Sequence, residues 1–131
     1  AGTVWHQEDA AALLSPDLFA EFIAPCDQRI VDALGNCIMH QHPVGYVPYR
    51  EYLDMGFTAL ELHVDEGGPS AEDLCAIHRE ILGRSPLLIW GRLSDADLEW
   101  VFGELPAAGL AIQVEVDSPE QAEAIWQRHI G

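Results

Sequence analysis

The sequence predicts an α/β fold in which parallel strands alternate with helices. Short apolar runs alternate along the chain with segments of helical spacing, and the connections between them are short, an order typical of a parallel sheet with right-handed crossovers. The predicted strand at residues 57–64 is polar on one face, whereas a doubly wound sheet buries both faces of each strand. Four strand-helix units in 131 residues therefore predict half of a TIM-type barrel, since a complete barrel needs about 250 residues.

The first helix is expected to begin at Ser15 and to end at Gly35. Ser15 can cap it, Pro16 suits its first turn, and apolar residues recur at helical spacing throughout. Pro25 lies inside this pattern and lacks the backbone donor of an ordinary residue. We therefore expect Pro25 to kink this helix or to divide it.

Four strand-helix units follow. The strands are expected at residues 37–42, 57–64, 86–91 and 110–117. The helices are expected at about 47–55, from Ser70 to Gly83, from Ser94 and from Ser118, with serine as the cap of the last three. The last helix is expected to pack through a stripe formed by Ala122, Ile125, Trp126 and His129. No repeat or linker interrupts this order, so residues 1–131 are expected to form a single half-barrel domain.

The charge of the chain excludes several classes of partner. The formal net charge is −16, from 22 acidic residues against six arginines and no lysine. Such a chain repels nucleic acid and anionic membrane surfaces, and no apolar run approaches the roughly 20 residues that span a bilayer. We therefore expect no nucleic-acid or membrane partner. A metal ion or a cationic or neutral small-molecule ligand suits the charge better.

The cysteines indicate a reducing compartment. The three cysteines, Cys26, Cys37 and Cys75, are odd in number and show no paired close spacing, so a disulfide framework is not expected. Cys37 reads as a small core residue and Cys75 as a residue on a helix face. No signal peptide is recognisable at the start of the sequence. The expected location is the cytoplasm.

Histidines and carboxylates gather at the ends of the predicted strands. His40 and His42 lie two residues apart, so they share one face where their strand ends. Glu61 and His63 repeat this spacing on the next strand, and Gln113, Glu115 and Asp117 repeat it on the last. We predict a divalent-metal site at His40, His42 and His63, with Glu61 or Glu115 as the carboxylate that moves a proton. The alternative is that one histidine stacks in the interior while the other binds a carbonyl group.

Other residues near these strand ends have two interpretations each. Trp90 and Arg92 can form a ligand wall, or Trp90 can belong to the core, and Tyr46 can line the cavity or pack the short helix after His42. Glu8 and Asp9 act as acid/base groups if they border the cavity, and otherwise form a solvated pair. The segment 65–68 is expected to be an ordinary loop. His6, His78 and His129 lie outside the strand ends and are expected at the surface or on helices.

Several segments resemble a known family. Residues 15–25 and 29–33 resemble the C-terminal half of the uroporphyrinogen decarboxylase superfamily, which also contains the zinc-dependent cobalamin methyltransferases. Residues 38–45, Ile-Met-His-Gln-His-Pro-Val-Gly, fall where the methyltransferases carry a His-x-Cys-Gly motif, and Glu8-Asp9 looks like the acidic pair that precedes the first helix in that branch. Residues 55–60 and 88–91 are similar to the segments that lead into the next two strands of that family. The likeness covers nearly the whole chain.

This resemblance implies a metal site and a reaction class. In the methyltransferase branch the His and Cys of the motif bind zinc together with a later cysteine, and the zinc activates a thiol for methyl transfer. By that resemblance His40 takes the His position, His42 replaces the Cys, and His63 or Glu61 lies on the strand that supplies an acid. The late cysteine is missing, and Glu115 is the nearest residue able to act as a ligand. A His/Glu set suits a Lewis-acid or water-activating zinc, or manganese or iron, better than thiol alkylation.

The resemblance also implies a partner. The N-terminal half of the barrel, which supplies the arginines and the aspartate for an acidic tetrapyrrole in the decarboxylases, has no counterpart in this sequence. A half-barrel exposes a sheet edge and its interior unless a second copy or a partner half-barrel chain covers them. We therefore expect a homodimer with metal-assisted methyl transfer or hydrolysis. The competing hypothesis is a non-catalytic fragment or subunit that serves as a protein-interaction module.

Overall fold

A five-stranded parallel sheet forms the centre of the molecule. The computed structural model describes residues 2–131, and its strands lie side by side in chain order with every neighbouring pair parallel. The strands are β1 (Val4–Gln7), β2 (Cys37–Gln41), β3 (Ala59–Val64), β4 (Leu87–Gly91) and β5 (Leu110–Val114). The predicted α/β class, with parallel strands that alternate with helices, is therefore confirmed.

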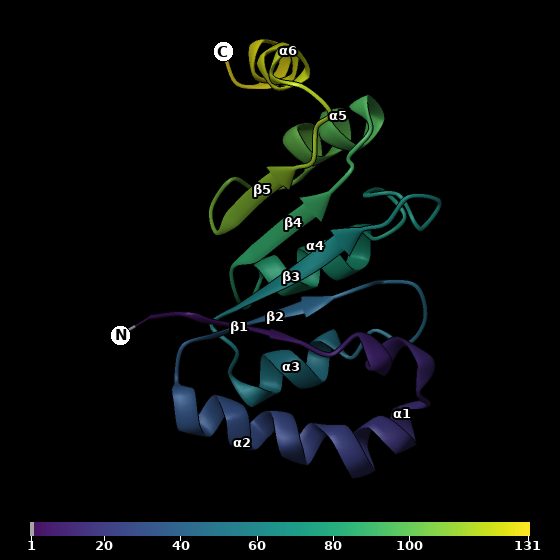
Figure 1. Cartoon of the computed structure of the whole chain (residues 1–131), viewed down its shortest axis with the longest axis vertical. Helices are drawn as coiled ribbons and strands as arrows, with labels where there is room; N and C mark the ends of the chain where they lie inside the picture. Colours follow the sequence, from purple (N-terminus) through teal and green to yellow (C-terminus); the bar gives the residue numbers. More distant parts are fainter. Residues whose placement is uncertain (1) are drawn as a thin grey trace.

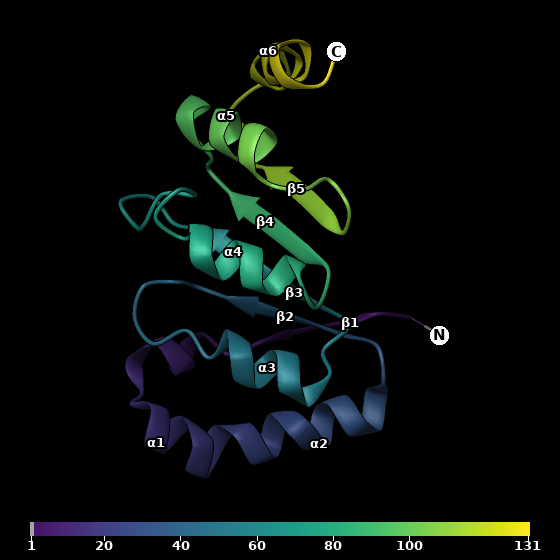
Figure 2. The same cartoon turned by 180° about the vertical axis from the view of Figure 1, so that it is seen from behind.

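The helices that connect the strands cover one face of the sheet. Figures 1 and 2 show α3, α4 and α5 together on one side of the strands, with α2 beside them at the β1 end. Right-handed crossovers between strands in sequential order place every connecting helix on the same face, so the other face is left open. The helical segments are η1 (Asp9–Leu13), α1 (Pro16–Leu18), η2 (Phe19–Ile23), α2 (Ala24–Leu34), α3 (Tyr49–Met55), α4 (Cys75–Leu82), α5 (Asp95–Glu104) and α6 (Pro119–His129).

The expected interruption of the first helix near Pro25 is confirmed. The segment η2 is a π-helix between α1 and α2, and the backbone N–H of Ala24 donates to the carbonyl of Phe19, five residues earlier. Pro25 has no N–H, and its ring clashes with the carbonyl four residues before it in a regular helix. The wider π turn absorbs this conflict without ending the helix.

The two faces of the sheet differ as the pattern of β3 predicts. Leu60, Leu62 and Val64 point to the helices and are buried in the core, with Met39 and Ile89 from the neighbouring strands. Their burial removes apolar surface from water and is the main stabilising contribution to the fold. The alternate residues of β3 belong to the open face, where the polar side chains lie.

Strand β1 was not among the predicted strands. Val4–Gln7 pairs with β2, and His6 on its helix-facing side hydrogen-bonds Asp27 of α2 at 2.9 Å. Because β1 is an edge strand, Val4 and Trp5 remain exposed, and the four residues lack the continuous apolar run of a central strand. This exposure explains why the pattern did not indicate a strand.

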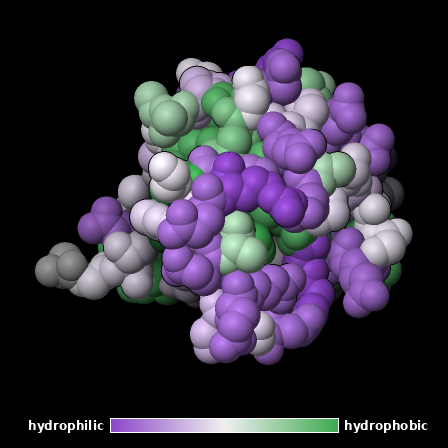
Figure 3. Space-filling view, turned by 90° about the horizontal axis from the view of Figure 1, so that it is seen from above, coloured by the Kyte–Doolittle hydropathy of each residue, from purple (hydrophilic) through white to green (hydrophobic). Residues whose placement is uncertain are grey.

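Two predictions about helix residues were wrong. In α6, Ala122 and Trp126 are exposed, because this helix follows the last strand and lies beside α5 at one end of the molecule. Ile125 packs on the core and His129 stacks on Phe102. Ser70 was expected to cap the helix that ends at Gly83, but α4 begins at Cys75 and no side chain caps it. His78 lies on this helix, as expected, and is completely buried. The face seen from the α6 end is hydrophilic with hydrophobic patches between the polar residues (Figure 3).

Among residues 2–131, no helix has both the length and the apolar character needed to cross a bilayer.

The cysteines lie as expected, with Cys37 buried in β2 and Cys75 partly buried at the start of α4.

Candidate metal site on the open face of the sheet

The open face of the sheet is hollowed by a cavity of about 570 Å³. Side chains from all five strands or their ends line it: Trp5, Gln7, His40, His42, His63, Trp90, Gln113 and Glu115. Strand register explains this convergence, because His63 pairs with Trp90 and Trp90 pairs with Gln113 in adjacent parallel strands. Residues two apart then fall on the same face. The cavity therefore lies over the carboxyl half of the sheet, where α/β proteins bind ligands.

His40 is held by a buried carboxylate. It lies opposite Glu61 in the β2–β3 register, and its Nδ1 hydrogen-bonds Glu61 Oε2. Glu61 is fully buried and His40 is nearly so. The hydrogen bond to Glu61 raises the pKa of His40, against the opposing effect of burial. An ionised carboxylate only accepts hydrogen bonds, so a carboxylate in this position favours the tautomer that carries its proton on His40 Nδ1.

His42 is held in the same way from the loop after β3. Its Nδ1 lies 2.9 Å from both carboxylate oxygens of Asp65, so this nitrogen also donates. A neutral imidazole with a protonated Nδ1 has a bare Nε2. Each of the two histidines therefore presents Nε2 as its free ligand atom.

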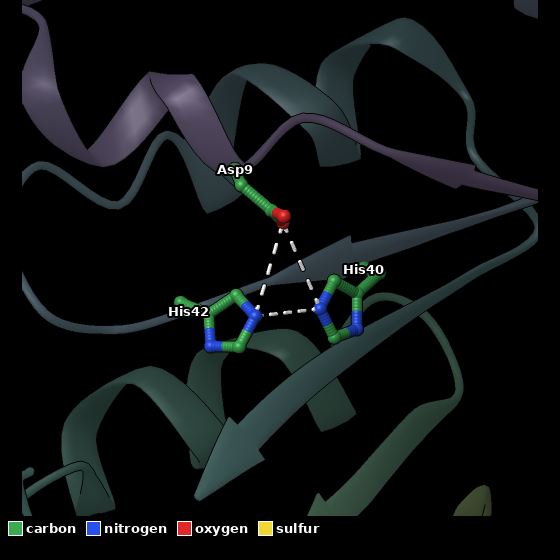
Figure 4. Close-up of side chains that lie close together, drawn as sticks. All are labelled: Asp9, His40 and His42. Carbon is green, nitrogen blue, oxygen red and sulfur yellow. Dashed lines mark hydrogen bonds and ion pairs between the residues drawn. The ribbon is translucent and has the colours of Figure 1, made fainter. Parts of the chain in front are cut away.

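The two Nε2 atoms point toward one another. They are 2.9 Å apart, and Asp9 Oδ1 lies 3.8 Å from each of them (Figure 4). Two lone pairs at this distance repel unless a proton or a metal cation lies between them. The arrangement can thus act as a shared-proton pair or as a metal site, and these three residues form one of the two compact ligand groups within the described chain.

Asp9 reaches this position from η1, which follows β1. The Gln7 amide donates to both Asp9 oxygens at 3.1 and 2.9 Å. On the other side, η1 packs against the loop after β2, where Gly45 lies so close to the Ala12 carbonyl that a Cβ would clash with it. Gln7 and Gly45 therefore place the Asp9 carboxylate opposite the histidine pair.

His63 belongs to a second group that shares His40. His63 Nδ1 lies 3.9 Å from Glu61 Oε1, and His40, Glu61 and His63 together could hold an ion. Within the described residues, Glu61 Oε1 and His63 Nδ1 are buried without a hydrogen-bond partner, which is costly for polar atoms. The imidazole ring of His63 also lies 4.9 Å from that of His42, centroid to centroid.

The structure brings together most of the predicted site residues. His40, His42, His63, Trp90 and Glu115 line the cavity, and Glu61 lies directly beneath His40. Tyr46 and Arg92 do not line this cavity, although Tyr46 lines a small pocket next to it with Asp9 and His42. Tyr46 donates to Glu51 at 2.6 Å and packs on Phe19, whereas Arg92 pairs with Asp117 at 2.7 Å.

Four residues of the site were not assigned to it from the sequence. Asp9 was left between an acid/base role and a solvated pair, and Asp65 was assigned to an ordinary loop. Trp5 and Gln7 were overlooked with β1 itself. A signal existed for Asp65, since it lies two residues beyond His63 and so continues the spacing of polar residues along β3.

Comparisons of the chain with protein-family models, with curated proteins and with solved structures found no match. The function of this site must therefore be inferred from its geometry.

Proposed function

We propose that the chain is a divalent-metal-binding protein in which His40, His42 and Asp9 hold the ion at the cavity on the open face of the sheet. The observation that carries this proposal is the pair of facing Nε2 atoms 2.9 Å apart, with a carboxylate oxygen 3.8 Å from both. Zinc–nitrogen bonds are about 2.0–2.1 Å long, so one ion can reach both nitrogens.

The carboxylates behind the rings favour a metal over a shared proton. Metal-binding histidines commonly donate their other ring nitrogen to a carboxylate, which fixes the tautomer and raises the basicity of the ligand nitrogen. Here Glu61 takes this position for His40 and Asp65 takes it for His42. One carboxylate behind each ring thus orients both rings with Nε2 as the ligand atom.

The donor set favours zinc, with manganese or iron as alternatives. Two imidazoles and one carboxylate are harder than a thiolate set and are typical of catalytic sites with three protein ligands and an open coordination position. A bound ion of this kind supplies Lewis acidity that activates a water molecule or a thiol. The reaction class that we propose is metal-assisted hydrolysis, which the His/carboxylate set suits, or methyl transfer, which the resemblance to the uroporphyrinogen decarboxylase superfamily implies.

Two further carboxylates of the site, Glu61 and Glu115, have different roles in this proposal. Glu61 is fully buried and bound to His40, so its role is to position that ligand. Glu115 lines the cavity and is exposed, so it can take up or deliver a proton at a bound ligand. Trp90 also lines the cavity, and its ring centroid lies 5.3 Å from that of His63 and 6.0 Å from that of His40.

Completion of the barrel by a second copy belongs to the same proposal. Within residues 2–131, the outer edges of β1 and β5 have no strand partner, and the edge of a sheet readily pairs with another chain. A homodimer would close the cavity from above. Light scattering coupled to size-exclusion chromatography tests this directly. A measured mass of twice the chain mass supports the dimer, and the mass of a single chain contradicts it.

Zinc binding by matched variants tests the metal site. Zinc content is measured after dialysis, and zinc affinity is measured in competition with a fluorescent chelator. The wild type should hold about one tightly bound ion per chain. His42→Gln should weaken zinc binding by at least a hundredfold. Asp65→Asn, which removes the carboxylate behind His42, should weaken it by about 10 to 100-fold. His129→Gln, on α6, is the control and should leave affinity unchanged.

The same experiment distinguishes the two ligand groups. His63→Gln should reduce zinc affinity far less than His42→Gln, because His63 lies in the other group. If His63→Gln abolishes binding while His42→Gln and Asp9→Asn do not, the ion is held by His40, Glu61 and His63 instead. A wild-type chain that binds no zinc contradicts the proposal, and the half-barrel would then be better explained as an interaction module.

A further inference from the structure

We infer that the cavity beside the metal site binds a small organic cation, with the ammonium group of a methylated amine lying against Trp5 and Trp90. This inference rests on the proposed function, because it names the substrate class of the same cavity. Three features of the described chain support it: aromatic walls, unbalanced carboxylates and the absence of basic side chains from the lining.

The two tryptophans form an aromatic corner across the sheet. Trp5 belongs to β1 and Trp90 to β4, yet their ring centroids are 6.0 Å apart and nearly perpendicular at 78°. Neighbouring strands are about 4.8 Å apart, so a flat sheet would separate β1 from β4 by about 14 Å. The two indoles therefore approach one another over the open face of the sheet. Trp5 is 46% exposed, so it has a face free for a ligand.

Perpendicular indoles are suited to methylated ammonium groups. The negative face of a tryptophan ring attracts a cation within about 6 Å of the ring centroid, and two rings at an angle can contact one trimethylammonium group together. A neutral apolar ligand of the same shape would gain the contact area but not this attraction. The rings by themselves therefore favour a cation only if the surrounding charge does not oppose it.

The charges around the cavity are negative. Glu115 lines it, Asp9 lies at its edge, and Glu61 and Asp65 lie behind the two histidines. These four carboxylates outweigh a single bound dication by two charges when the histidines are neutral. The site therefore remains attractive to a cation after the metal ion is bound.

Basic side chains do not offset this charge. Among the described residues, none of those that line the cavity is Arg or Lys, and the chain has no lysine. Five arginines pair with carboxylates outside the cavity: Arg50 with Glu80, Arg79 with Glu104, Arg84 with Asp54, Arg92 with Asp117 and Arg128 with Asp95. The sixth, Arg29, lies on the outer surface of α2. The lining of the cavity therefore offers an anionic ligand no basic side chain.

Choline and 3,3-dimethylbutan-1-ol provide a matched pair of probes, because they have the same shape and differ in charge. Each is titrated into the zinc-loaded protein by calorimetry, with tryptophan fluorescence as a second readout. Choline should bind at least tenfold more tightly than the neutral alcohol. Trp90→Leu and Glu115→Gln should each reduce choline affinity severalfold or more without reducing zinc content. Trp126→Leu, which removes an exposed tryptophan of α6, should leave choline affinity unchanged.

The outcomes separate this inference from the metal site. Equal binding of the two probes, or no binding of choline by a protein that holds one zinc per chain, overturns the inference and leaves the metal site intact. Choline binding by a protein that cannot be loaded with zinc supports the cation pocket and overturns the metal proposal. If Trp126→Leu weakens choline binding as much as Trp90→Leu does, the cation lies outside the cavity and the inference fails.

Discussion

Stability should depend on pH through His78, a buried histidine far from the proposed metal site. His78 has no exposed surface, and within the described chain neither ring nitrogen makes a hydrogen bond of normal length. Burial lowers the pKa of His78 from 6.5 to about 4, and the effect of burial outweighs that of the Ala71 backbone, which raises the pKa. The unfolded chain takes up a proton near pH 6.5, whereas the folded chain takes it up only near pH 4. The unfolded state therefore binds more protons between these values, and the free energy of unfolding falls as the pH falls.

The magnitude follows from the two pKa values. Between pH 7.5 and 5.0, a shift from 6.5 to about 4 should cost the folded state about 2 kcal/mol. His78→Leu removes this contribution. Chemical denaturation of both proteins across this range, with a chelator present, should show the wild type losing about 2 kcal/mol more than the variant. If the free energy of unfolding changes with pH in the same way for the two proteins, the assignment of a buried, neutral His78 is refuted.

Three further substitutions test how the backbone positions the sheet and the site. Gly91→Ala should destabilise the fold by about 2 kcal/mol in chemical denaturation, because Gly91 has φ +142° and a Cβ there would clash with the Val64 carbonyl; unchanged stability would show that the strand end adjusts freely. Ser94→Ala should cost about 1 kcal/mol by the same assay, because it removes the capping box of α5; a smaller loss than in an exposed mid-helix control would argue against that cap. Gly45→Ala should weaken zinc binding about tenfold in a chelator competition, because it displaces the segment that carries Asp9; full zinc affinity with normal folding would mean that Asp9 is not a ligand.

Much of the fold could be predicted because the signals are local. In β3 the alternation of Leu60 and Leu62 with Glu61 and His63 predicts both the strand and its two unlike faces, and the structure has both. Ser94 predicts the start of α5, since it caps the helix through the backbone N–H of the third residue after it. These features depend on a few neighbouring residues, which the sequence displays directly.

The missed elements depend on distant parts of the chain. Val4–Gln7 is a strand because β2 accepts it as an edge partner, and no apolar run marks it. His78 is buried because α4 lies against the sheet between α3 and α5, and its own helix does not reveal how much of its face is covered. Trp126 is exposed for the opposite reason, since α6 lies at one end of the described chain, beyond α5.

The candidate site was predicted in outline from the strand ends. The two-residue spacing of His40 and His42, repeated by Glu61 and His63, predicted that these side chains share one face of the sheet. In the structure, the parallel pairing of β2 with β3 brings them together. Asp9 could not be assigned, because its place depends on the 3-10 turn after an unpredicted strand and on the contact with Gly45. The resemblance to the decarboxylase superfamily remains a prediction, as does completion of the barrel by a second copy.

The most direct test of the central claim is anomalous diffraction at the zinc edge from crystals grown with one equivalent of zinc. We expect an anomalous peak about 2.0–2.1 Å from Nε2 of both His40 and His42, with the Asp9 carboxylate turned toward it. A structure with no peak there, with the two rings sharing a proton at the 2.9 Å separation, would contradict it. So would zinc bound only by surface carboxylates away from the cavity.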